Sequence, residues 1–238
     1  MLVASLLERL AEDPAAAALL LDVDGTLAPI VRRPELAAVP GETRAELERL
    51  VTTYGLVACV SGRTAADAAR VVGVEGVRYV GEHGLELEPD AEEWAGRLRA
   101  FGATVDWPSE PGKLLTLAYH YRSKDDEEQS VRVLQAVAER ALQEGLRPRW
   151  GRKVLEIRPP LDADKGTAVR RLLASAGLRR ALYAGDDSTD LDAFRGLDGL
   201  ELAVRVAVVS DEGPTELGLA ADLVVGGTGE LLELLRRL

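Results

Sequence analysis

The chain has 238 residues, of which 47% are hydrophobic, and its formal net charge is −11. This length and apolar content support one large domain or two small ones with a packed core. No apolar run approaches the roughly 20 residues that cross a bilayer, and the N-terminus lacks the pattern of a secretory signal. We therefore expect a cytoplasmic protein without a membrane partner, and a monomer rather than an oligomer. The acidic charge argues against nucleic-acid binding, because phosphate backbones favour basic surfaces.

The first part of the chain alternates short apolar runs with amphipathic stretches. Residues 17–21 and 56–60 are apolar and end abruptly in polar or glycine-rich turns, which is typical of buried parallel strands. Residues 41–53 and 65–72 have the spacing of amphipathic helices. The single cysteine, Cys59, falls within the second apolar run, which predicts a buried side chain without a disulfide partner.

The middle of the chain, residues 85–160, differs in composition. It contains all three Trp residues, an acidic helix-like segment at 125–144 and two candidate strands at 114–121 and 153–158. Glycine or proline residues mark both of its ends, as they do at linkers. We therefore predict an inserted α+β domain over these residues.

The last part of the chain returns to the pattern of the first. Residues 165–176 predict a helix, and the apolar runs 181–184 and 204–209 predict further buried strands. Strands that alternate with helices form parallel sheets covered on both faces. The prediction is thus a doubly wound, mostly parallel, Rossmann-like α/β core made of residues 1–84 and 161–238, with the smaller α+β domain inserted.

Two aspartates, Asp22 and Asp24, follow directly after the first predicted strand, in the sequence Asp-Val-Asp-Gly-Thr. Aspartates at this spacing can divide a phosphoryl transfer between them, because one attacks phosphorus while the other protonates the leaving alcohol. The plainer alternative is an Asx turn that closes the strand end. We interpret the pair as catalytic.

A second acidic group follows the predicted strand at 181–184 and contains Asp186, Asp187 and Asp190. Three carboxylates this close repel one another unless a cation lies among them, and Mg²⁺ prefers oxygen ligands of this kind. The alternative is a polar turn that caps a helix through Ser188 or Thr189. Beside the first pair of aspartates, the group predicts a Mg²⁺ site.

Two further residues have the chemistry to hold a phosphate. Ser61 follows the predicted strand at 56–60, in the sequence Ser-Gly-Arg, and offers a hydroxyl group and main-chain donors to a phosphate oxygen. Lys165 opens a predicted helix, where its ammonium would add to the positive end of the helix dipole. Taken alone, Ser61 is a weak signal because Ser-Gly is common in turns, and Lys165 is better interpreted as an ordinary solvated lysine.

Together these four motifs, in this order and each at a strand end or helix start, resemble the haloacid dehalogenase-like phosphohydrolases. The resemblance implies that Asp22 is the nucleophile and that Asp24 is the general acid/base. It implies a Mg²⁺ site formed by Asp22, the main-chain carbonyl of Asp24, and Asp186. Ser61 and Lys165 would hold the phosphoryl group.

The resemblance extends to the inserted domain. An insertion between the serine and lysine motifs is similar to the C2-type cap of this superfamily, which closes over the site and selects the substrate. Asp187 or Asp190 would then lie in or near the shell of residues behind the metal ligands.

A narrower resemblance covers nearly the whole chain. Residues 22–29, 81–84, 120–122, 156–159 and 185–190 are together similar to trehalose-6-phosphate phosphatases. The sugar-contacting residues that this resemblance implies are Lys113, Arg122, Arg152 and Glu156. One departure is that the acidic residue ahead of the lysine is displaced by one position, at Glu110.

The leading hypothesis is therefore Mg²⁺-dependent hydrolysis of trehalose 6-phosphate, a small-molecule substrate, through an aspartyl phosphate on Asp22. A phosphatase for a related sugar phosphate, such as sucrose phosphate or mannosyl-phosphoglycerate, shares the same core motifs. A catalytically silent sugar-phosphate-binding regulatory protein would keep the fold but lose the nucleophile, the acid/base or the metal ligand. This sequence retains all three.

Overall fold

The computed structural model describes residues 2–31, 33–121, 126–151, 153–210 and 213–238. The chain divides into two compact units. The first, here called the core unit, comprises Met1–Gly84 and Ala163–Leu238. The second, the inserted unit, comprises Leu85–Asp162. Each unit has its own hydrophobic core.

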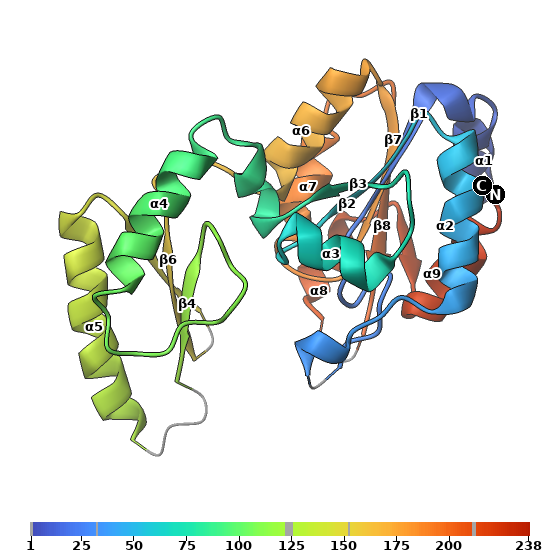
Figure 1. Ribbon diagram of the computed structural model, residues 1–238. Coiled ribbons are helices and arrows are strands. Elements are labelled where there is room, and N and C mark those ends of the chain that lie inside the picture. Colours follow the sequence, from blue (N-terminus) through green and yellow to red (C-terminus); the bar gives the residue numbers. More distant parts are fainter. Residues whose placement is uncertain (1, 32, 122–125, 152, 211–212) are drawn as a thin grey trace. The chain divides into compact units, whose positions relative to one another are not determined.

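The core unit is built on a six-stranded parallel sheet with the order β3-β2-β1-β7-β8-β9 (Figure 1). Its strands are β1 (Ala17–Leu21), β2 (Leu56–Val60), β3 (Arg78–Val80), β7 (Arg180–Gly185), β8 (Leu202–Val208) and β9 (Leu223–Val225). The strand order reverses direction between β1 and β7, so the carboxyl ends of these two strands flank a crevice in the topology.

The central strands are buried on both faces, which explains their apolar composition. All five residues of β1 are buried, and its leucines alternate between the two sides of the sheet. Leu21 is in register with Cys59 on one neighbouring strand and with Ala184 on the other. Burial raises the pKa of the Cys59 thiol, so this group is an inert core residue, as the sequence predicts.

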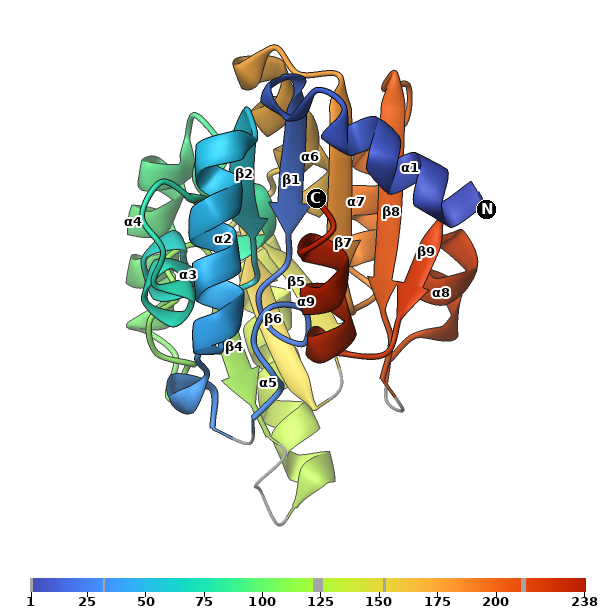
Figure 2. The same cartoon turned by 90° about the vertical axis from the view of Figure 1, so that its right-hand side faces the viewer.

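Helices cover both faces of this sheet. Figures 1 and 2 show α1, α2 and α9 on one face and α6 and α7 on the other. The helices of the core unit are α1 (Leu2–Ala11), α2 (Gly41–Thr53), α3 (Ala65–Val72), α6 (Lys165–Ala176), α7 (Asp190–Gly196), α8 (Thr215–Ala220) and α9 (Thr228–Leu235). Single turns of 3₁₀ helix lie at Pro14–Ala16 and Pro34–Leu36, and the segment Glu82–Leu87 contains two short turns separated by a kink at His83 and Gly84. This arrangement confirms the predicted doubly wound α/β core.

The inserted unit is a three-stranded antiparallel sheet with two helices. The sheet has the order β4-β6-β5, with β4 (Leu117–His120), β5 (Arg147–Gly151) and β6 (Val154–Arg158). Helices α4 (Ala91–Gly102) and α5 (Glu127–Gln143) supply Leu98, Phe101 and Leu134 to a core that also contains Leu155 and Ile157 of β6. The predicted α+β composition is confirmed, although the strand expected over 114–121 is limited to β4.

Among the described residues, no helix combines the length and the apolar character needed to cross a membrane.

Helices α6 and α7 pack closely because glycines lie where they cross. A Cβ atom at Gly166 would lie 2.2 Å from the main-chain oxygen of Asp192, and one at Gly196 would lie 2.8 Å from the oxygen of Gly166. Both distances are shorter than any normal contact, so a larger residue would push the helices apart. The position of the first residue of α6, Lys165, therefore depends on this contact.

The substitution Gly166→Ala should overpack this crossing and lower the free energy of unfolding by about 1–3 kcal/mol. The control is Gly229→Ala in α9, because a Cβ atom there has nothing within 4 Å and alanine favours a helix. Guanidinium unfolding of both variants measures the difference. Equal midpoints for the two variants would show that the crossing tolerates a methyl group.

Candidate active site

Three of the predicted site residues lie where adjacent strands of the core sheet end. Asp22 follows β1, Ser61 follows β2 and Asp186 follows β7, and β1 lies between the other two strands. In parallel sheets, ligands bind beyond the carboxyl ends of the strands, at the point where the strand order reverses. Ser61 is 39 positions and Asp186 is 164 positions after Asp22 in the sequence. The fold thus places residues from distant motifs at the same edge of the sheet.

The turn after β1 leaves room for the side chain of Asp186 close to the end of the strand that carries Asp22. Gly25 has a φ of 78°, and its amide donates to the carbonyl oxygen of Ala28 at 2.8 Å, which folds the chain back on itself. A Cβ atom at Gly25 would lie 1.9 Å from a carboxylate oxygen of Asp186. Only glycine at this position leaves room for the Asp186 side chain.

Lys165 is a buried lysine held at the start of α6. The helix begins with a capping box, in which the carboxylate of Asp164 accepts from the amide of Thr167 at 2.7 Å and the Thr167 hydroxyl accepts from the amide of Asp164 at 2.9 Å. The ammonium of Lys165 lies 2.8 Å from Asp22 Oδ1 and 2.7 Å from Asp190 Oδ1. The side chain is 3% exposed, so the ion pairs replace its hydration.

Asp190 supports this lysine from behind and is fully occupied. Its Oδ1 accepts from Lys165 and from the hydroxyl of Tyr183, each at 2.7 Å. Its Oδ2 accepts from the amides of Asp186 and Asp187, each at 2.9 Å. The side chain is 0% exposed, and these four donors satisfy it without any ligand.

The side chain of Asp187 lies outside this hydrogen-bonded group, although its charge adds to the repulsion that raises the pKa of Asp186. It is exposed, and its carboxylate accepts from the amide of Ser188 at 2.6 Å, as in an ordinary polar turn.

The pKa values of the site residues are set by burial and by the small number of cations, since Lys165 is near both Asp22 and Asp190. Burial raises the pKa of the Asp22 carboxyl well above its ordinary value, although Lys165 opposes the shift. Burial would lower the pKa of Lys165, but the attraction of Asp22 and Asp190 outweighs burial, so the pKa is raised. Burial, followed by repulsion from Asp190, raises the pKa of Asp186 to about 7. A second cation beside Asp22 and Asp186 would relieve this repulsion.

The residues fit a small divalent cation. Asp22, Asp186 and Asp190 each offer an oxygen, and these oxygens all lie within 4.8 Å of one another. Because the oxygens of Asp190 are already used by four donors, Asp22 and Asp186 are the two carboxylates left for an ion. A pair of carboxylates with main-chain oxygens and water is a typical set of ligands for Mg²⁺.

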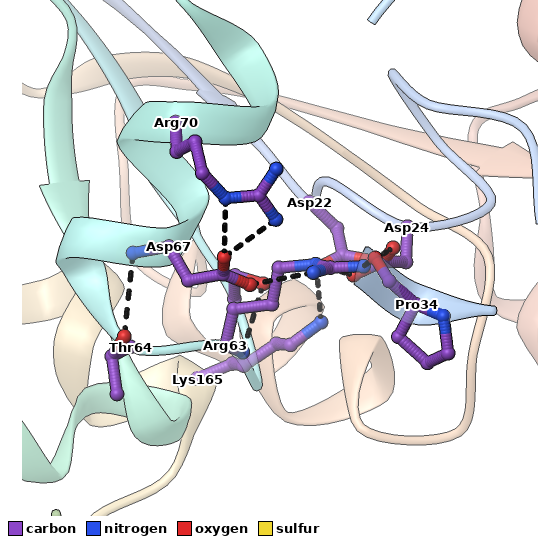
Figure 3. Close-up of polar contacts among 9 residues, drawn as sticks. Asp22, Asp24, Pro34, Arg63, Thr64, Asp67, Arg70 and Lys165 are labelled. Carbon is purple, nitrogen blue, oxygen red and sulfur yellow. Dashed lines mark hydrogen bonds and ion pairs between the residues drawn. The ribbon is translucent and has the colours of Figure 1, made fainter. Parts of the chain in front are cut away.

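Asp24 is held by an arginine that the sequence motif contains. Figure 3 shows the guanidinium of Arg63 beside the carboxylate of Asp24. Arg63 Nε donates to Asp24 Oδ2 at 2.6 Å, and Nη2 donates to Asp24 Oδ1 at 2.7 Å. This bidentate pair fixes the orientation of the carboxylate in a way that a single contact does not.

Ser61 lies on a loop that a strained turn fixes in place. The residue is 1% exposed, and its carbonyl oxygen accepts from the amide of His83 at 2.9 Å. The amide of Glu82 donates to the carbonyl oxygen of Arg63 at 2.7 Å. Glu82 and His83 both have positive φ values, of 48° and 56°, which L-residues rarely adopt. The turn thus tethers the loop through two hydrogen bonds.

Glu156, one of the predicted sugar-contacting residues, lies on the inserted unit's sheet. Leu155 and Ile157 point into the core of that unit, so the alternation of β6 places Glu156 on the other face. Its cross-strand neighbours are Ala118 on β4 and Arg149 on β5.

Of the remaining predicted sugar-contacting residues, the structure describes Lys113. Lys113 lies half-buried in the segment before β4. Glu110, the displaced acid of the same segment, lies 3.2 Å from Nε2 of His120. Arg122 and Arg152 lie outside the described residues.

Sequence reasoning missed two supporting residues of the core unit. Tyr183 lies within an apolar strand and gave no polar signal, but its hydroxyl donates to Asp190. Arg63 belongs to the Ser-Gly-Arg motif, yet its side-chain contacts join segments 39 positions apart and could not be inferred from spacing. A charged residue directly after a predicted phosphate loop was the available signal.

Comparison with known proteins identifies relatives over most of the chain. The profile of the Trehalose-phosphatase family matches residues 20–110 and 112–220. A trehalose-phosphate phosphatase of Mycobacterium marinum is 34% identical over 213 residues, which cover 79% of this chain and 54% of that protein. A probable trehalose-phosphate phosphatase 3 of Oryza sativa subsp. japonica is 34% identical over 92% of this chain and 68% of the relative.

The fold is shared with solved structures. The C-terminal domain of the C. albicans trehalose-6-phosphate phosphatase superposes with a TM-score of 0.72 at 23% identity, covering 98% of this chain and 95% of that one. The chain spans about half the length of the M. marinum relative, 54%. The matched residues include both halves of the core unit and the inserted unit between them. The chain therefore belongs to the Trehalose-phosphatase family.

Proposed function

We propose that the chain hydrolyses trehalose 6-phosphate to trehalose and phosphate, with Asp22 as the nucleophile. The observation that carries the proposal is the placement of the Asp22 carboxylate. It lies at the strand end where the order reverses, within 2.8 Å of a buried lysine and beside Asp186. A carboxylate that only stabilised the fold would not require a second, incompletely neutralised carboxylate next to it.

The first step transfers the phosphoryl group to the protein. A carboxylate oxygen of Asp22 attacks phosphorus, the bond from phosphorus to the sugar oxygen breaks, and that oxygen takes a proton from the carboxyl group of Asp24. Lys165 offsets the negative charge that gathers around Asp22 as the phosphate approaches, and its fixed position means that no side chain has to reorganise. The Ser61 hydroxyl, whose oxygen accepts from the amide of Arg63 at 3.2 Å, would donate its proton to a phosphoryl oxygen.

The second step releases phosphate. A water molecule gives a proton to the Asp24 carboxylate and attacks phosphorus, and the bond from phosphorus to the Asp22 oxygen breaks. Inorganic phosphate leaves, and both aspartates return to their starting protonation states. The side chain of Asp24 is 41% exposed, which allows both the sugar oxygen and water to reach it.

Mg²⁺ is the cofactor we propose for this site. Asp22, Asp186 and the main-chain carbonyl of Asp24 would hold it, and it would supply positive charge to the phosphoryl oxygens. The supporting observations are the pair of carboxylates left without enough cations and the preference of Mg²⁺ for oxygen ligands.

The substrate assignment rests on family membership and on the chemistry of the inserted unit. The relatives named above are described as trehalose-phosphate phosphatases. Glu156 and Arg149 are cross-strand neighbours on the sheet of the inserted unit, the first half-buried and the second exposed, and both side chains can hydrogen-bond to sugar hydroxyls. Lys113 and the residues Arg122 and Arg152 remain predicted sugar contacts.

Replacing the nucleophile tests the reaction. Asp22→Asn should lower phosphate release from trehalose 6-phosphate at least about 1,000-fold, because an amide cannot form the aspartyl phosphate. Asp13→Asn is the matched control, since this exposed aspartate precedes β1 at the opposite end of the strand. Phosphate release with Mg²⁺ or with EDTA measures both variants.

The same assay decides the substrate. A panel of trehalose 6-phosphate, sucrose phosphate and mannosyl-phosphoglycerate should show selective turnover of the first. Faster turnover of another sugar phosphate would change the substrate assignment, whereas the proposed phosphatase reaction would stand. Full activity of Asp22→Asn would mean that the proposed nucleophile is wrong.

Mg²⁺ binding should weaken as the pH falls below 7. The pKa of Asp186 is raised from 3.8 to about 7, so in the metal-free folded protein this group is protonated below that pH and must release its proton to bind the ion. The apparent affinity should fall by up to about tenfold per pH unit in this range. Between pH 4 and 7 the folded state binds one more proton at Asp186 than the unfolded state does. In the absence of metal, the contribution of this group to the free energy of unfolding therefore falls as the pH rises through this range.

The increase in melting temperature caused by Mg²⁺, measured from pH 5 to 8, tests this linkage. The increase should grow with pH in the native chain and should be small at every pH in Asp186→Asn. A Mg²⁺-induced increase that is the same at pH 5 and pH 8 would contradict the assignment of Asp186 as a ligand.

Glu156 should affect sugar recognition without affecting the chemistry. Glu156→Ala should lower kcat/KM for trehalose 6-phosphate about 10-fold or more, since charged hydrogen bonds contribute about 1.5–3 kcal/mol each. It should leave the hydrolysis of 4-nitrophenyl phosphate within about twofold, because that ester lacks the sugar. Glu139→Ala, on the exposed side of α5, is the control. An equal loss for both esters would place Glu156 outside the sugar site.

A further inference from the structure

Arg63 connects Asp24 to a second carboxylate, that of Asp67, which none of the sequence motifs includes. While Nε and Nη2 of Arg63 bind Asp24, its remaining terminal nitrogen, Nη1, donates to Asp67 Oδ2 at 2.6 Å. Nη2 also donates to the carbonyl oxygen of Pro34 at 3.1 Å. Figure 3 shows the guanidinium between the two carboxylates. All three nitrogens of the guanidinium therefore have an acceptor.

Burial differs sharply along this chain of contacts. The Arg63 side chain is only 11% exposed, whereas the side chains of Asp24 and Asp67 are 41% and 37% exposed. The main chain of Arg63 is also anchored, because its amide donates to the Ser61 hydroxyl at 3.2 Å and its carbonyl accepts from Glu82. The arginine is thus a fixed part of the core unit, and it lies between two partly exposed carboxylates.

We propose that Asp67 is a positioning residue: it holds the guanidinium of Arg63, and through it sets the orientation of the Asp24 carboxylate for proton transfer to and from the leaving oxygen. The inference rests on the proposed function, since it needs Asp24 as the acid/base. A bidentate pair fixes the plane of a carboxylate only if the guanidinium itself cannot rotate. Asp67 supplies that restraint from the side opposite Asp24.

The local structure holds Asp67 ready for this task. It lies in the first turn of α3, where its amide donates to the Thr64 hydroxyl at 3.3 Å. Its other oxygen, Oδ1, accepts from Arg70 Nε at 2.9 Å and Nη2 at 2.7 Å. Burial would raise the pKa of Asp67, but the hydrogen bonds from Arg63 and Arg70 outweigh burial and lower the pKa, so the group stays charged.

A purely structural role would have a different signature. An acidic residue in the first turn of a helix stabilises the helix by about 0.3–1 kcal/mol. Its loss would lower the melting temperature and would reduce the activity toward all substrates alike. A positioning role has to depend on the leaving group instead, because only a poor leaving group needs a well-placed proton.

The test compares two esters in the full chain with Mg²⁺. Trehalose 6-phosphate releases a sugar alcohol, which needs a proton, and 4-nitrophenyl phosphate releases a phenolate, which does not. Asp67→Ala should lower kcat for the sugar phosphate about 10- to 100-fold and for the aryl phosphate by no more than about twofold. Asp67→Glu, which keeps the carboxylate, should recover most of the loss.

Two further variants calibrate the result. Arg179→Ala removes an exposed ion pair with Glu201 at the end of β7 opposite the site, and should leave both esters within about twofold of the native rates. Asp24→Asn should show the same preference for the aryl ester as Asp67→Ala, and a larger loss of sugar-phosphate turnover. Melting temperatures of all variants separate loss of folded protein from loss of rate.

The possible outcomes distinguish failure of the positioning role of Asp67 from failure of the proposed function. Equal losses for both esters in Asp67→Ala, or no loss for either while Asp24→Asn is selective, overturn the positioning role and leave the proposed function standing. A change in KM alone for both esters also overturns it, because it would assign Arg63 to phosphate binding. If the native chain releases phosphate from neither ester, or Asp22→Asn keeps full activity, the proposed function itself fails and the positioning role fails with it.

Discussion

A lysine ammonium buried between two carboxylates is the interaction on which the site depends. Lys165 is 3% exposed and lies within hydrogen-bonding distance of Asp22 and Asp190, so its hydration has been replaced entirely by protein groups. Removing one partner of a buried ion pair typically costs about 3–5 kcal/mol, because the other charge is left uncompensated. The ends of β1, β7 and α6 are therefore tied to one another by charge as well as by packing.

The acidic residues near this lysine have separate roles because their surroundings differ. Asp190 is satisfied by four donors and belongs to the scaffold. Asp186 is paired with no arginine or lysine among the described residues, and its pKa is raised to about 7, so it is the carboxylate that most needs a cation. Asp24 is open to solvent but held by Arg63. Aspartates at the same edge of the sheet thus have different roles because their burial and their hydrogen-bond partners differ.

Much of the core unit could be predicted because its signals are local. The strands at 17–21 and 56–60 and the helices at 41–53, 65–72 and 165–176 have the bounds that their apolar patterns predict. Strand β5 has the sequence Arg-Pro-Arg-Trp-Gly, lies at the edge of its sheet and is largely exposed, so it lacks an apolar alternation that could be recognised. The contacts of Arg63 and Tyr183 depend on how distant segments pack, which composition and spacing do not contain.

The lone thiol of Cys59 offers a chemical view of the sheet from within. It is completely buried and in register with Leu21, the residue that precedes Asp22. Thiol reagents need an accessible thiolate, so they can modify this residue only while the centre of the sheet is open. Since the chain contains no other cysteine, the rate of modification measures how often the sheet opens at the paired strands β1 and β2. The protein thus contains its own probe for the rigidity of the strand that presents the nucleophile.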